Sequence, residues 1–174
     1  MNGAAEIALV GAAVGAVLTF SLSQVDARLR RRRQGRAAAR LIWYELMGAR
    51  AVVRELKQGR VFLGDPPFST HAWRSEQTAF TEVADAYAFA VVGLAYDQVE
   101  GLQRNYSELA KVAESKGTSL HELADARGSQ FLGSLSEHCF DALEKALVQV
   151  DRYSGLATGP VDYAELDEQS GLRR

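Results

Sequence analysis

Residues 7–25 read IALVGAAVGAVLTFSLSQV, nineteen consecutive positions without a formal charge. At about 1.5 Å per residue, a helix of this length measures about 28 Å, close to the roughly 30 Å hydrocarbon core of a bilayer. The stretch is apolar on all sides for about four helical turns, whereas a helix packed on one face of a soluble protein carries polar residues along its other side. We therefore predict a transmembrane anchor within residues 1–27.

The residues after this stretch predict its orientation. A run of arginines follows it and no basic residue precedes it: Arg28, Arg30, Arg31, Arg32, Arg33, Arg36 and Arg40. Because basic flanks stay on the cytoplasmic side, we expect an inner-membrane (plasma-membrane) protein with its amino terminus outside and its bulk in the cytoplasm. A cleaved signal peptide would carry its basic residues before the apolar run. A signal peptide and a buried soluble helix remain the alternatives.

Charge is segregated along the chain, although the formal net charge is only -2. Residues 28–60 carry eleven basic and two acidic residues, and residues 61–174 carry nine basic and eighteen acidic ones. The basic stem at residues 28–40 is typical of segments that contact anionic lipid headgroups, so we expect the lipid bilayer as a partner. Nucleic acid is not expected, because no aromatic residues interleave with the arginines and the following domain is acidic.

Beyond the stem, apolar residues recur with the 3.6-residue period of helices. Ile42, Leu46, Ala49, Val53 and Leu56 form one such stripe. The pattern predicts a first helix that ends near Gly59, followed by a loop over residues 60–69 and a short helical turn over residues 71–80, capped by Ser69 or Thr70. A long helix that ends at about Lys116, before Gly117, comes next. The last predicted helix begins at a capping box at Ser119–Glu122 and runs to about Tyr153, where Gly155 closes it.

The predicted fold is therefore all-α: an N-terminal transmembrane helix followed by a small antiparallel bundle of about three long helices. We divide the chain into an anchor (1–27), a basic juxtamembrane stem (28–40), a cytoplasmic bundle (41–155) and a flexible C-terminal tail (156–174). Whether the anchor continues unbroken into the first bundle helix stays open, since only Gly35 and Gly48 disfavour it. The long helix is expected to bury Val83, Tyr87, Val91, Leu94, Leu102, Tyr106 and Leu109.

Two surfaces are candidates for contacts with other proteins. Gly11 and Gly15 form a G-x-x-x-G pair that lets two membrane helices pack closely, although frequent alanine makes such pairs common by chance. Phe68 and Trp73, in the predicted loop at residues 64–73, are the best candidates for an exposed apolar patch. Another protein or a second copy of this chain is the expected partner.

No catalytic, cofactor or metal site is assigned. The single cysteine excludes a disulfide scaffold, and no nucleotide-binding, hydrolase or zinc-protease motif occurs. A metal or ligand site would need converging side chains. The candidates are the pairs His121–Asp125 and Glu137–Asp141, each four residues apart, together with His138 and Cys139. The pattern favours a non-enzymatic, membrane-anchored protein with a helical interaction domain. The alternative is a membrane-tethered helical bundle that binds a small ligand or metal, or that is catalytic.

The segment from Arg40 to Leu94 contains LIWYEL, a proline-containing loop, a T-x-x-W helix start and VADAYAFAVVGL. This order resembles a recurrent pattern in uncharacterised bacterial single-pass membrane-anchored helical proteins, in which an aromatic-E-L turn precedes the loop. The resemblance covers roughly a third of the chain. It implies membrane association and helices, and it carries no assigned activity and no site residues.

Overall fold

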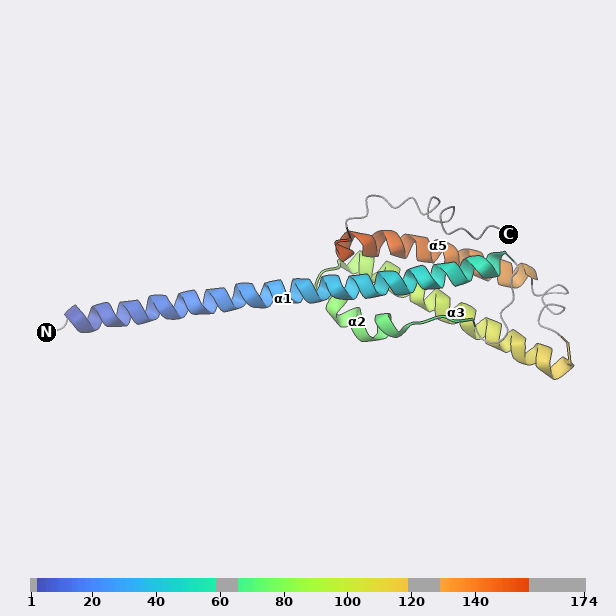
Figure 1. Ribbon diagram of the computed structural model, residues 1–174, viewed down its shortest axis with the longest axis horizontal. Coiled ribbons are helices and arrows are strands. Elements are labelled where there is room, and N and C mark those ends of the chain that lie inside the picture. Colours follow the sequence, from blue (N-terminus) through green and yellow to red (C-terminus); the bar gives the residue numbers. More distant parts are fainter. Residues whose placement is uncertain (1–2, 59–65, 119–128, 157–174) are drawn as a thin grey trace.

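Helix α1 runs without interruption from Gly3 to Lys57. The computed structural model describes residues 3–58, 66–118 and 129–156, without the side chains at 3–14 and 129–132. At 55 residues, α1 is about 80 Å long. Its first half extends away from the other helices and its second half forms part of a bundle (Figure 1). The expected anchor, stem and first bundle helix are therefore one helix, and Gly35 and Gly48, which cost only about 1 kcal/mol each, do not interrupt it.

The apolar start of α1 does not bear out the predicted membrane anchor. Across the described parts of the chain, no helix is long enough and apolar enough to cross a membrane. This finding corrects the predicted single-pass inner-membrane location. Gly11 and the earlier part of the expected span lie outside the residues whose side chains are described.

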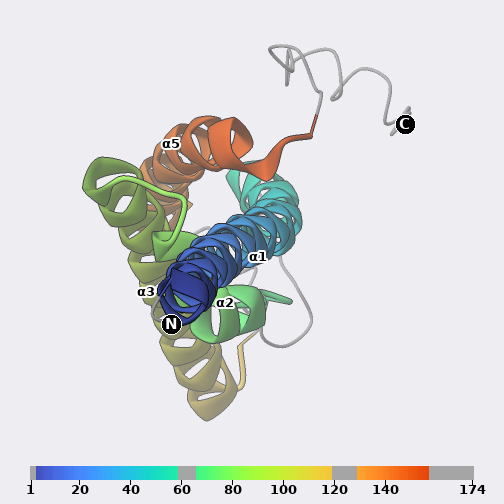
Figure 2. The same ribbon diagram turned by 90° about the vertical axis from the view of Figure 1, so that its left-hand side faces the viewer.

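Three further helices complete the described part of the fold: α2 (His71–Thr81), α3 (Ala86–Lys116) and α5 (Ser129–Ser154). Each of α2, α3 and α5 runs antiparallel to the described helix before it, and α5 packs alongside α1 (Figures 1 and 2). The all-α bundle is thus confirmed. The described residues form four helices, not three, because the short helical turn expected over residues 71–80 is α2, a helix of 11 residues.

The helix ends follow ordinary capping chemistry. Asp85 accepts a hydrogen bond from the backbone N–H of Ala88 at 2.7 Å and begins α3. Gly117 and Gly155 take positive φ angles of 63° and 59° directly after α3 and α5, as expected for helix-ending glycines. The predicted capping box at Ser119–Glu122 and the tail at residues 157–174 lie outside the described residues.

The bundle core confirms one predicted stripe and corrects another. Ile42, Leu46 and Val53 are fully buried on α1. On α3, Leu102 and Tyr106 are buried as predicted. Tyr87 and Leu94 are exposed, however, and the other buried residues of this helix include Ala88, Val92, Ala95, Tyr96 and Val99. Residues 86–96 are apolar on nearly every side, so the sequence alone could not indicate which face of α3 is buried.

Helix α1 lies close to the end of α2 at Gly35. A Cβ atom at this position would lie 2.5 Å from Cγ1 of Val83 and 3.0 Å from the carbonyl oxygen of Ala79. Ala79 belongs to the last turn of α2 and Val83 follows the end of that helix, and neither the Ala79 backbone nor the branched Val83 side chain can move aside cheaply. The absence of a side chain at Gly35 is therefore what allows α2 to pack against α1 at the base of the projecting segment.

We predict that Gly35→Ala lowers the free energy of unfolding by about 1–3 kcal/mol, because the added methyl group overlaps Val83 and Ala79. The matched control is Gly48→Ala on the same helix, where nothing lies within 4 Å of the added Cβ. This control should raise stability by about 0.4–1 kcal/mol, since alanine restricts the unfolded chain. Urea denaturation of both variants measures the difference, and equal effects would contradict the close approach.

Candidate functional site

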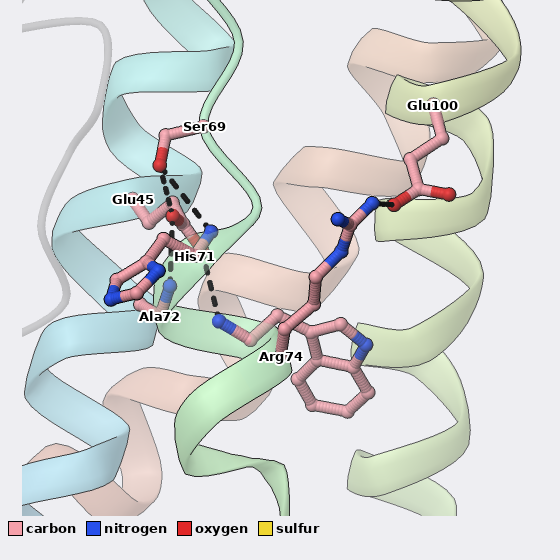
Figure 3. Close-up of polar contacts among 7 residues, drawn as sticks. Glu45, Ser69, His71, Ala72, Arg74 and Glu100 are labelled. Carbon is pink, nitrogen blue, oxygen red and sulfur yellow. Dashed lines mark hydrogen bonds and ion pairs between the residues drawn. The ribbon is translucent and has the colours of Figure 1, made fainter.

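The carboxylate of Glu45 connects three helices. Its Oε1 accepts hydrogen bonds from Oγ of Ser69 and from the backbone N–H of Ala72, at 2.5 and 3.0 Å. Its Oε2 accepts from the backbone N–H of Trp73 and from the hydroxyl of Tyr96, at 3.0 and 2.8 Å. Figure 3 shows Glu45 reaching from α1 to the first turn of α2. We call Glu45, Ser69, Ala72, Trp73 and Tyr96 the Glu45 junction.

Glu45 takes over the N-terminal capping of α2. Thr70 occupies the N-cap position, but its side chain makes no capping hydrogen bond. The other predicted capping residue, Ser69, accepts a hydrogen bond from the backbone N–H of His71 at 3.4 Å. The first backbone N–H groups of a helix have no partner within the helix, and a negative charge there is also favoured by the helix dipole. A carboxylate from a neighbouring helix meets both requirements, so the start of α2 is fixed to α1 as well as capped.

The junction favours the ionised form of Glu45. Burial raises the pKa of this carboxyl, but the hydrogen bonds from Ser69, Ala72, Tyr96 and Trp73 together outweigh burial and hold the pKa below its ordinary value. The phenol of Tyr96 is affected in the opposite direction, because burial and the neighbouring Glu45 carboxylate both raise its pKa. At neutral pH the junction therefore consists of an ionised Glu45 and a neutral Tyr96.

Aromatic rings pack beside the junction. The Trp73 ring stacks on Tyr96 with centroids 5.2 Å apart and planes 10° from parallel, and it also contacts Phe89 at 5.1 Å. Phe68 and Trp73, the predicted partner-contact residues, are both partly buried and packed against the core. Both residues thus pack against the bundle core, and these contacts help to hold α2 in place.

A second set of polar contacts fixes α5 to α1. The Arg40 guanidinium donates from Nε to the backbone carbonyl oxygen of Ser154, 2.8 Å away at the end of α5. This cation meets the carbonyls at the negative end of a helix, a favourable arrangement. Near the other end of the α1–α5 contact, Arg50 forms an ion pair with Glu144 and lies over the Phe140 ring. Arg40, predicted as part of a lipid-facing stem, thus contributes to the bundle.

The remaining predicted stem residues lie on the segment of α1 that projects from the bundle. We call residues 15–34 the arm, and every described side chain in it is exposed. The arm carries several large apolar side chains: Val17, Leu18, Phe20, Leu22, Val25 and Leu29. Arg28, Arg30, Arg31, Arg32 and Arg33 follow on the same segment, and Arg36 is exposed just beyond it. Arg30 pairs with Asp26 at 2.7 Å on the helix surface.

The residues proposed for a ligand or metal site do not converge in the described part of the chain. Cys139 is buried in the core, and burial raises the pKa of its thiol to about 12. His138 is exposed, and its ring nitrogen Nδ1 lies 2.7 Å from the carbonyl oxygen of Ser134. His121 and Asp125 lie outside the described residues. Within those residues, no three His, Cys, Asp or Glu side chains are placed to hold a metal ion.

A shallow groove between α3 and α5 has a volume of about 500 Å³ and includes Leu94, Gln98, His138, Asp141 and Lys145 among its lining residues.

Comparison with protein-family models, with curated proteins and with solved structures gives no match for this chain.

We predict that Glu45→Gln lowers the free energy of unfolding by about 1–3 kcal/mol at pH 7, because an amide has one acceptor oxygen for contacts that the carboxylate makes with two. Because the pKa of Glu45 is lowered in the folded state, its contribution is present above the ordinary pKa of 4.5 and is lost as the pH falls through the lowered value. Urea denaturation between pH 3 and pH 7 should show the difference from wild type shrinking toward acid.

The exposed Glu137 on α5 provides the control for this measurement. Glu137→Gln should change stability by less than about 0.5 kcal/mol at either pH, as surface substitutions commonly do. A Glu45→Gln variant that matches this control at pH 7 would contradict the structural role of the junction.

Proposed function

We propose that this chain acts by binding another protein, not by catalysis, and that the arm of α1 is its docking element. The observation that carries the proposal is the exposure of the arm. Its large apolar side chains, among them Phe20 and Leu22, are all exposed, although the second half of α1 is packed into a bundle. Contiguous apolar surface of this kind is typical of interaction sites.

The energetics of helix formation support the same proposal. Most of the stability of helices in proteins comes from packing of an apolar face, since an isolated helix is marginal in water. The bundle supplies that packing for residues 38–53 of α1, where Ala38, Ile42, Leu46 and Val53 are buried. The arm receives no such packing from the described bundle, so a partner helix or surface would stabilise it.

The bundle would hold the arm in a defined direction. Gly35 brings α2 against α1 directly after the arm ends, and Arg40 joins α1 to the end of α5 one turn later. A docking element fixed at its base loses less conformational freedom on binding than a flexible one. In this proposal the bundle holds the arm in position, and its packed core stabilises the bundle.

Site-specific photo-crosslinking in cells that naturally express the protein tests this proposal. A benzophenone amino acid replaces Leu22 in the arm or, as a control, Tyr87 on α3, two positions with nearly equal exposures of 69% and 68%. We expect crosslinked protein adducts from position 22 and few from position 87. Absence of protein adducts at position 22, or adducts with lipid alone, would contradict the proposal.

A further inference from the structure

We infer that the partner of the arm is a second copy of this chain, with the two arms packed antiparallel. This inference rests on the proposed docking function of the arm and names its partner. Its starting point is a stripe of exposed residues, Leu18, Leu22, Val25 and Leu29, separated by steps of four, three and four. Such spacing places the four side chains along one seam, as in helices that pair side by side.

The seam is symmetric about its own centre. If a second arm lies antiparallel with the axis between Leu22 and Val25, then Leu18 meets Leu29 of the other copy and Leu22 meets Val25. Each of the four apolar residues of the seam thus faces an apolar residue of the other copy. This self-complementarity is what a two-fold interface between identical chains requires.

Electrostatics select the antiparallel direction. In a parallel pair, the arginines from Arg28 to Arg33 would lie beside the same residues of the other copy, at a helix spacing of about 8–10 Å, close to one Debye length at physiological salt. In the antiparallel pair, Arg32 lies opposite Gly15, and the two Arg32 residues are roughly 26 Å apart along the axis. The repulsion between the two arginine runs is then largely screened.

The charge of the bundle acts in the same direction. Residues 41–155, which form the bundle, carry sixteen acidic and eleven basic residues, so the bundle has a net negative charge. Parallel arms would bring two such bundles next to each other, whereas antiparallel arms place them at opposite ends of the pair. The uncharged part of each arm, including Val17 and Thr19, instead lies beside the arginines of the other copy.

Disulfide crosslinking of the full-length chain distinguishes the two directions. Two variants are made, Leu18→Cys and Leu29→Cys, and each is oxidised alone and in an equal mixture. In the antiparallel register, residues 18 and 29 of different copies face each other, whereas two copies of residue 29 are about 16 Å apart, beyond the roughly 7 Å limit for a disulfide. The native Cys139 does not interfere, because it is buried in the core.

We expect disulfide-linked dimers in the mixture at a level at least about tenfold above that of either variant alone. The matched control is Ser23→Cys, which lies near the centre of the pair but points away from the seam and should not crosslink. Dimers from each single variant and none specific to the mixture would show parallel arms and overturn the inference.

A chain that stays monomeric by light scattering, while position 22 still yields adducts with a different protein, would overturn the second copy as partner and leave the docking function intact. A monomeric chain that inserts its arm into phospholipid vesicles and yields only lipid adducts at position 22 would overturn both.

Discussion

The structure depends first on the carboxylate of Glu45. This group satisfies the first backbone N–H groups of α2 and the buried hydroxyl of Tyr96 on α3. Helix α2 has only 11 residues, and a helix of that length is marginal without external contacts. Its position is therefore set by α1, and the loop before it and the Trp73–Tyr96 stack follow from that placement.

Contacts at the base of the arm extend this constraint. Gly35 permits α2 to end against α1, and Arg40 binds the final carbonyls of α5 within the next two turns. The arm thus leaves the bundle at a point where helices on two sides are fixed to α1. For a protein whose proposed function is docking, this arrangement means that the direction of the arm is determined by interactions within the bundle.

Periodicity predicted the helices well, and it predicted the polar junction poorly. The stripe through Ile42, Leu46 and Val53 is buried as expected. Tyr87 and Leu94 were placed on the wrong side of α3, since the first turns of that helix are apolar almost all round. Periodicity also could not distinguish an exposed apolar arm from a membrane span, because both read as an uncharged helical stretch.

The role of Glu45 was not visible in the sequence, although the residue belongs to the LIWYEL segment that the sequence singled out. Its hydrogen-bond donors include two backbone amides that lie 27 and 28 residues further along the chain. Backbone groups have no residue-specific signal, so no spacing rule connects them to a carboxylate on another helix. The T-x-x-W helix start was the one local sequence feature that drew attention to the first turn of α2, where these amides lie.

A double-mutant cycle between Glu45 and Tyr96 tests the central claim most directly. Glu45→Gln, Tyr96→Phe and the double variant are compared with wild type by urea denaturation at pH 7. Because the hydroxyl of Tyr96 donates to the Glu45 carboxylate at 2.8 Å, the two substitutions should be coupled by about 1–2 kcal/mol. Additive effects, with a coupling energy near zero, would contradict the account that this carboxylate holds α1, α2 and α3 together.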